Sequence, residues 1–164
     1  MSKEQTDDLL KFLSPFPIDI QETALWLREF VWDLYPKANE LIYDSYNAVA
    51  FGWSLTDKLG QMFCGVGVYR SNYNIHFSFF YGSKLSDPKK LLLGAGKQYR
   101  YILVKRQEDF PKAYIKKLMK EAYANSLIKM KDAKPIITGS TITKAIYEKK
   151  RKHTEKKKMT KKST

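Results

Sequence analysis

Four acidic residues between positions 19 and 33 have a spacing that places carboxylates on one side of a helix. Their successive intervals of 3, 7 and 4 residues return to the same side at about 100° per residue. Exposed carboxylate oxygens of this kind bind hard cations and would hold iron weakly. The alternative is the solvated face of an ordinary amphipathic helix. The candidate metal ligands are Asp19, Glu22, Glu29 and Asp33.

A second group of residues predicts an aromatic ligand pocket on a sheet. Positions 73–81 alternate so that one face is strongly apolar and the other is mixed and includes a histidine. Gly65 and Gly67 share a face with a tyrosine, and paired glycines let a ligand approach the backbone. An arginine nearby would bind a carboxylate or phosphate with its planar fork. The alternative is an aromatic core in which the histidine is hydrogen-bonded at its edge and the arginine pairs with an acid such as Asp87. The pocket candidates are Trp53, Tyr69, His76 and Arg100.

Most of the positive charge lies at the C-terminal end. The chain has 164 residues and a formal net charge of +13, and 13 basic residues against 3 acidic ones follow Ile128. Such a segment binds polyanions, including nucleic acids, without sequence specificity. The tail from Glu148 onward has neither the aromatic residues that stack on bases nor an amphipathic pattern suited to a bilayer. The alternative is a solubilising extension. The candidate polyanion-binding residues are Lys149, Lys150, Arg151, Lys152, Lys156, Lys157, Lys158, Lys161 and Lys162.

The other reactive residues form no recognisable catalytic motif. Positions 94–97 read GAGK, but the earlier glycine of a phosphate loop is missing and Gln98 stands where a serine or threonine would bind magnesium. Cys64 is the only cysteine, and with two histidines it cannot supply a structural zinc site. We therefore expect a protein that is not an enzyme and has no structural zinc, and weakly bound iron is the cofactor hypothesis.

Length and composition fit one domain with a polar extension. A hydrophobic content of 43% is enough to build a core. No apolar run approaches the roughly 18 residues that span a membrane, and the N-terminus is acidic where a secretory signal is basic. We expect a soluble, cytoplasmic protein without a membrane span.

Helices are predicted on both sides of a block of strands. The capping-box spacing from Ser2 to Gln5 predicts a short first helix. Apolar residues at helical intervals predict a second helix over 18–35. A short helix is predicted over 87–94. A long helix is predicted from 110 to about 125, with Asp109 as its N-cap.

Aromatic and β-branched runs with a period of two predict the strands. A hairpin turn at 70–73 makes two of them antiparallel. An isoleucine-rich run at 136–147 predicts the last strand. The fold class is therefore α+β, with two layers and an antiparallel sheet of about five to six strands packed against N-terminal and C-terminal helices. Residues 1–147 form the domain, and 148–164 form a basic tail that is expected to be disordered. The other predicted strands are 40–45, 47–54, 61–70, 73–81 and 98–104.

Two stretches resemble one bacterial family. Residues 35–52, which read YPKANELIYDSYNAVAFG, resemble the strand entry of the YdhG-like domains of unknown function. The sequences LSDP at 85–88, LLLGAGK at 91–97 and RYI at 100–102 are similar to the later signature of one branch of that family. The resemblance covers about residues 5–128. It implies a compact α+β fold related to frataxin-like iron chaperones, in a family most of whose members have no established activity.

These observations support three functional hypotheses. The leading one is a non-enzymatic cytoplasmic binding or accessory domain of the YdhG-like type, with weak iron binding in the manner of a frataxin-like chaperone. The first alternative is a nucleic-acid-associated protein that its lysine-rich tail anchors nonspecifically. The second alternative is a small-ligand sensor or an enzyme that uses the aromatic pocket on the sheet.

Overall fold

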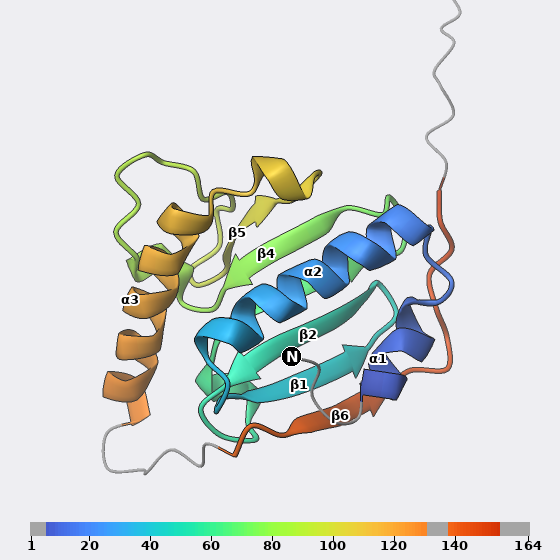
Figure 1. Cartoon of the computed structure of the whole chain (residues 1–164), viewed down its shortest axis with the longest axis horizontal. Helices are drawn as coiled ribbons and strands as arrows, with labels where there is room; N and C mark the ends of the chain where they lie inside the picture. The colour runs from blue at the N-terminus through green and yellow to red at the C-terminus, as the bar shows by residue number, and fades with distance from the viewer. Residues whose placement is uncertain (1–5, 131–137, 155–164) are drawn as a thin grey trace, which may run out of the picture.

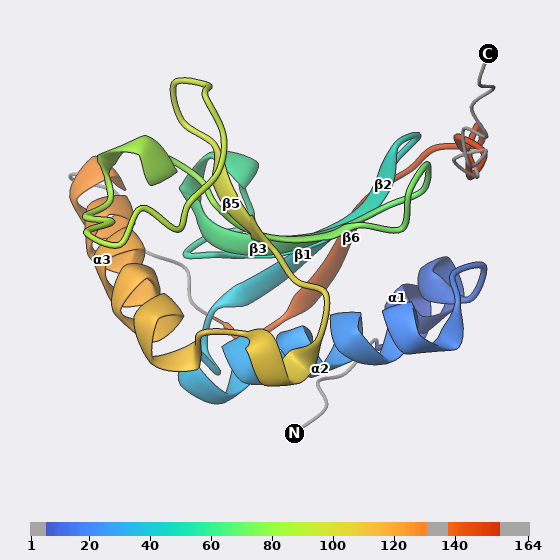
Figure 2. The same ribbon diagram turned by 90° about the horizontal axis from the view of Figure 1, so that it is seen from above.

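The protein is built on a six-stranded mixed sheet with the strand order β5-β4-β3-β2-β1-β6. The computed structural model describes residues 6–130 and 138–154. Helices α1 and α2 cover one face of the sheet, whereas no helix of the described residues covers the opposite, open face (Figure 1, Figure 2). This confirms the predicted two-layer α+β fold. The helices and strands are α1 (Thr6–Leu13), α2 (Ile18–Leu34), β1 (Asn39–Asp44), β2 (Ala48–Ser54), β3 (Met62–Tyr69), β4 (Ile75–Phe79), β5 (Arg100–Leu103), α3 (Lys112–Met130) and β6 (Thr141–Ile146).

Helix α2 lies across the sheet and organises the core. Pro17 occupies its N-cap, where a missing N–H costs nothing, and the helix ends at Leu34, just before Pro36. Its inner face is fully buried at Ala24, Leu27 and Val31. These bounds confirm the helix predicted over 18–35. No helix in the described ranges is long and apolar enough to span a membrane.

Helix α3 closes the end of the sheet where α2 stops (Figure 1). The ring of Tyr123 stacks on Tyr35 at 5.2 Å between centroids and meets Phe63 edge to face at 5.3 Å. The buried α3 residues Ile115 and Met119 belong to the same hydrophobic core as the inner face of α2. The three helices therefore share one core, on one side of the sheet.

Strand β2 points large side chains toward this core and small ones to the open face. On β2, Phe51 and Trp53 join the core, and Trp53 meets Trp32 of α2 edge to face at 6.1 Å. Because successive strand residues point to opposite faces, Ala50 and Gly52 belong to the open face. The alternation that the sequence predicted is thus the division between the two sides of the sheet.

The last strand enters the sheet in an unexpected direction. β6 pairs with β1 in parallel, so the sheet is mixed and not wholly antiparallel as expected. The chain approaches β1 at its N-terminal end, where the Asn39 side-chain oxygen accepts a hydrogen bond from Ser140 N at 3.1 Å. Gly139 makes this approach with a φ of +69° and donates its N–H to Lys37 O at 2.9 Å. A Cβ at this glycine would lie 2.8 Å from Pro36 O, so the entry needs glycine.

Two predictions about helices between β4 and α3 are wrong. No helix forms over 87–94, because the Asp87 carboxylate accepts hydrogen bonds from Leu91 N and Leu92 N at 3.0 and 2.9 Å and holds the segment as a loop. Asp109 does not cap α3. It lies in the 3-10 turn η3 (Gln107–Asp109) and pairs with Arg106 at 2.9 Å, while α3 starts at Lys112. The capping box of the first helix lies outside the described residues.

The ordered chain continues beyond the predicted domain boundary at 147. Arg151 N donates to Tyr46 O and Thr154 N donates to Ser71 O, each at 2.8 Å. These backbone bonds hold 148–154 against the turns that follow β1 and β3. The disorder predicted for 148–164 stays a prediction, and in the described part of this segment hydrogen bonds to the turns replace the hydrophobic contacts that it lacks. The rest of the predicted tail lies outside the described residues.

A buried ion pair joins α2 to the sheet. Arg28 Nε and Nη2 donate to the two carboxylate oxygens of Glu40 on β1, at 2.8 and 2.7 Å. Thr141 on β6 donates its hydroxyl to the same carboxylate at 3.0 Å. The exposed fractions of the Arg28 and Glu40 side chains are 3% and 0%. One carboxylate thus ties together α2, β1 and β6.

Replacing Glu40 alone should destabilise the fold strongly. Glu40→Met leaves the Arg28 guanidinium buried without its counter-charge, which costs about 3–5 kcal/mol of unfolding free energy in comparable pairs. The double variant Arg28→Met/Glu40→Met should lose less than the sum of the single variants. Urea unfolding measures both quantities. Arg106→Met breaks an exposed pair and should leave the midpoint unchanged. Additive losses in the double variant would contradict the coupling.

Candidate functional site

The open face of the sheet carries a groove with a volume of about 240 Å³. It runs over the middle of β2 and β3, and the 3-10 turn η1 (Leu59–Gln61) and the loop before β5 contribute to its sides. None of its lining residues has a charged side chain. The lining residues are Tyr43, Ser45, Ala50, Phe51, Gly52, Leu59, Met62, Gly65, Val66, Gly67, Tyr69, Ser78, Phe80 and Tyr99.

Small residues in register form the floor of this groove. Ala50 on β2 lies opposite Gly67 on β3, and Gly52 lies opposite Gly65. A Cβ added to Gly52 would lie 2.2 Å from the Met62 methyl carbon and 2.9 Å from the carbonyl oxygen of Cys64. Any larger residue at this position would therefore displace the neighbouring strand. The Met62 methyl group covers Gly52, and a Cβ added to Gly67 would lie 3.2 Å from the Tyr69 ring, so side chains of the groove pack over these glycines.

Tyrosine hydroxyls provide most of the polar atoms of the groove. The Tyr99 hydroxyl hydrogen-bonds with Tyr69 and Ser78, and Ser78 Oγ donates to Gly65 O at 3.3 Å. Burial, with the neighbouring tyrosines, raises the pKa of Tyr99 far above its ordinary value. Burial also raises the pKa of Tyr43. These hydroxyls stay neutral and protonated at physiological pH, so they can donate or accept hydrogen bonds without carrying charge.

His76 lies beside the groove on the same face of the sheet. Its ring stacks on Tyr101 with centroids 4.0 Å apart and planes at 3°, and it contacts Tyr69 at 4.4 Å. Burial lowers the pKa of this imidazole. Its buried Nδ1 has no hydrogen-bond partner in the described residues. A neutral histidine clamped between two tyrosines braces the wall of the groove.

The structure separates the four predicted pocket residues. Tyr69 lines the groove and His76 lies against it, but Trp53 faces the opposite side and is fully buried in the core. Arg100 donates through Nη1 to the carbonyl oxygens of Gly96 and Tyr99, at 2.5 and 2.8 Å. The prediction is therefore wrong for Trp53, because β2 alternation turns it inward, and for Arg100, because this residue does not line the groove and its Nη1 is bound to carbonyl groups of its own loop.

The alternative pairing of Arg100 with Asp87 is also wrong. Asp87 accepts hydrogen bonds from its own loop and from the Tyr114 hydroxyl, and these bonds lower the pKa of its carboxyl against the opposing effect of burial. Arg100 instead stabilises the loop that carries Tyr99, and its side-chain stem fills the space beside Gly82, where a Cβ would lie 2.6 Å from Arg100 Cβ. Arg100 thus positions a groove residue without lining the groove.

The predicted acidic face lies along α2 but does not converge on one point. At 1.5 Å per residue, the Cα atoms of Glu22 and Glu29 are separated by about 10 Å along the axis, and those of Asp19 and Asp33 by about 21 Å. Among the described residues, no three acidic, histidine or cysteine side chains are grouped so as to hold a metal ion. Trp26, which lies between Glu22 and Glu29 in the sequence, is half-buried against Phe110. The joint metal site is not formed.

The predicted polyanion-binding residues are divided between two environments. Lys149 and Lys152 are exposed. Lys150 and Arg151 are engaged with the end of the sheet, through Asp44 and Asn47 respectively. The remaining five predicted lysines, from position 156 onward, lie outside the described residues.

Sequence reasoning missed most of the groove lining. Tyr43 and Ala50 were not singled out, although they are opposite each other in the β1–β2 register. The available signal was the alternation of β2, which leaves Ala50 and Gly52 on the face of Gly65 and Gly67. Tyr99 lies within the predicted strand 98–104 but just before the observed start of β5, and the sequence pattern did not indicate that it reaches the groove.

The buried, neutral state of His76 predicts a specific pH dependence. Between its lowered pKa and the ordinary value of about 6.5, the unfolded chain binds more protons than the folded one, so the unfolding free energy decreases as the pH falls through this window. His76→Phe keeps a stacking ring but cannot be protonated. Above this pH window, the difference in unfolding free energy between the unmodified protein and the variant should be constant. As the pH falls through the window, the unmodified protein should lose stability relative to the variant. Urea unfolding from about pH 8 to about pH 5 tests this, and a difference that does not vary with pH would contradict it.

Comparison with known proteins adds no identification. No family model, no curated protein and no solved structure matches this chain. The resemblance to the YdhG-like domains therefore stays a prediction from the residues at 35–52 and 85–102.

Proposed function

We propose that this chain is a small-ligand-binding domain whose open-face groove takes a neutral, planar, mainly apolar molecule such as a fused aromatic or heteroaromatic ring. The observation that carries the proposal is the uncharged lining, in which glycines and alanine form the floor and aromatic rings form the walls. This develops the small-ligand alternative inferred from the sequence, as a binding function and without a reaction.

The size of the groove supports a small ligand. Pockets for drug-sized molecules have volumes of about 300–1,000 Å³, whereas a cavity of about 150 Å³ holds benzene. A volume of about 240 Å³ falls between these values. One or two fused rings would fill it, packed beside the Tyr69 ring that lies over Gly67.

The polar atoms of the groove support a neutral ligand. The hydroxyls of Tyr43, Tyr69 and Tyr99 offer hydrogen bonds, but none of the lining side chains can compensate a ligand charge. Burying a charged group without a partner is costly, so the groove should reject carboxylates and phosphates. Arg100 is not among the lining residues, and its Nη1 is bound to carbonyl groups of the adjacent loop.

We also propose that the protein is cytoplasmic and is related to the YdhG-like domains. Cys64 is a free and fully buried thiol, which suits a reducing compartment. Weak iron binding on the acidic face of α2 and nonspecific polyanion binding by the C-terminal lysines stay predictions from the sequence, and the proposed binding function does not depend on either.

Filling the floor of the groove should abolish ligand binding. Ala50→Leu projects a larger side chain over Gly67 and should weaken the binding of indole, used as the probe, at least about tenfold, or about 1.4 kcal/mol. Chemical-shift mapping by NMR measures the binding, with the largest shifts expected at Gly65, Gly67 and Tyr69. Ala124→Leu makes the same change at an exposed position of α3 and serves as the matched control.

A charged probe tests the neutrality of the site. Indole-3-carboxylate has the same ring as indole and should bind at least about tenfold more weakly, because the lining offers its carboxylate no cation. Equal binding of both probes, or shifts in the Ala50→Leu variant that match those of the unmodified protein, would overturn the proposed groove function.

A further inference from the structure

A second cavity lies at the edge of the sheet on the side of the helices. Its volume is about 190 Å³. It is bounded by the connection between α1 and α2, by the turn between β3 and β4, and by the segment that follows β6. Four of its seven lining residues have basic side chains. The lining residues are Pro15, Phe16, Arg70, Tyr73, Lys150, Arg151 and His153.

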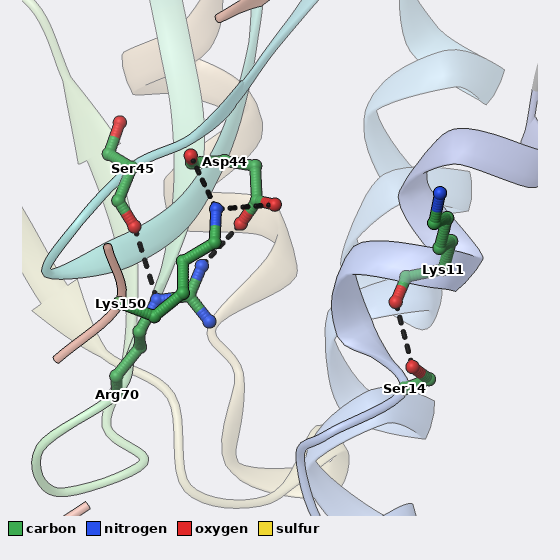
Figure 3. Close-up of polar contacts among 6 residues, drawn as sticks. All are labelled: Lys11, Ser14, Asp44, Ser45, Arg70 and Lys150. Carbon is green, nitrogen blue, oxygen red and sulfur yellow. Dashed lines mark hydrogen bonds and ion pairs between the residues drawn. The ribbon is translucent and has the colours of Figure 1, made fainter. Parts of the chain in front are cut away.

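Arg70 is the buried charge of this cavity, with an exposed fraction of 7%. Its Nε donates to Ser45 O at 3.1 Å, and its Nη2 donates to the Asp44 carboxylate (Figure 3). Its Cζ lies 5.7 Å from the ring centroid of Phe16, another lining residue. In the described part of the chain, Nη1 has no hydrogen-bond partner. A fixed, buried guanidinium therefore keeps two N–H donors available at the cavity.

The cavity has more positive charge than its acidic partner neutralises. Asp44 is shared, because Lys150 Nζ lies 2.8 Å from its Oδ2 while Arg70 holds its Oδ1, as Figure 3 shows. Arg151 adds a third cation, and its Nη1 donates to the neutral Asn47 amide oxygen at 3.1 Å. Three cations meet one carboxylate, so two positive charges are left uncompensated; Arg70 is buried and Lys150 is partly buried, whereas Arg151 is exposed at the mouth of the cavity. A bound anion would relieve this repulsion.

The backbone holds these cations in place before any ligand arrives. Tyr147 N donates to Asp44 O at 2.8 Å, and the bonds from Arg151 N and Thr154 N fix the rest of the segment. The His153 ring stacks on Tyr73 with centroids 3.8 Å apart and planes at 5°. Its Nδ1 donates to Arg70 O, 3.3 Å away, because a carbonyl oxygen can only accept. Binding therefore costs little ordering of the chain.

We propose that this cavity is a binding site for a phosphate group, either orthophosphate or the phosphate of a small phosphomonoester. Arg70 and Arg151 would donate to the phosphate oxygens with their guanidinium groups, and Lys150 would contribute its charge. The two uncompensated positive charges match a phosphate dianion, whereas a carboxylate would neutralise only one. The site is independent of the neutral groove, which lies on the opposite face of the sheet.

The test measures orthophosphate binding to the full chain by calorimetry, with chloride at the same ionic strength as the reference. Saturable binding of one phosphate is expected. Arg151→Gln removes one lining cation, leaves the buried Arg70–Asp44 pair intact, and should weaken binding at least about tenfold. Lys152→Gln removes the same charge at the adjacent exposed position, which does not line the cavity, and should change affinity less than about twofold.

Glycerol 3-phosphate distinguishes the two sources of the phosphate. Tighter binding than orthophosphate, with the same sensitivity to Arg151→Gln, assigns the site to a phosphomonoester, and weaker binding assigns it to free phosphate. The proposal is overturned if orthophosphate binds no better than chloride. It is also overturned if Lys152→Gln weakens binding as much as Arg151→Gln, because the charge of the whole segment would then account for the affinity. Neither outcome affects the binding of indole in the groove.

Discussion

The structure depends on one constraint, which is that every central strand must bury a large side chain at every second position against α2. Phe51 and Trp53 on β2 and Phe77 and Phe79 on β4 meet this demand on the helix side. The intervening positions are then free of the core. In the middle of β2 and β3 they hold alanine or glycine, whereas Tyr69 at the end of β3 forms a wall, and the groove is the space left beside these small residues once the opposite face has been packed.

Sequence patterns anticipated this layering because periodicity is a local property. The α2 stripe, the strand runs and the 70–73 turn could all be predicted from neighbouring residues. The direction of β6 could not, since it depends on contacts of Asn39 and Gly139 across about 100 residues of chain. The helix expected at 87–94 failed for a different reason. The Asp87 carboxylate accepts hydrogen bonds from backbone N–H groups that a helix would use. A pattern of apolar residues contains no information about such side-chain hydrogen bonds.

The candidate sites were harder to predict than the fold, because function depends on which face a residue occupies and on what already holds it. Trp53 and Arg100 have side chains that suit a ligand pocket. However, Trp53 is buried in the core, and Arg100 donates through Nη1 to two carbonyl groups of its own loop. In the C-terminal basic segment, residues expected to be solvated have partners in the fold. Its composition suggested a solvated tail, yet Lys150 and Arg151 reach fixed acceptors on the sheet. Composition gives the charge of a segment and not its partners.

The same alternation explains how an uncharged groove persists in a chain of net charge +13. Asp44 and Ser45 are consecutive, as are Tyr69 and Arg70, and each pair sends one side chain to each face. Ser45 and Tyr69 line the neutral groove, while Asp44 and Arg70 form the ion pair at the cationic cavity. The strand ends thus separate the two chemistries by the thickness of the sheet. On the helix side Asp44 neutralises one of the three cations, and none of these cations lines the groove on the other face.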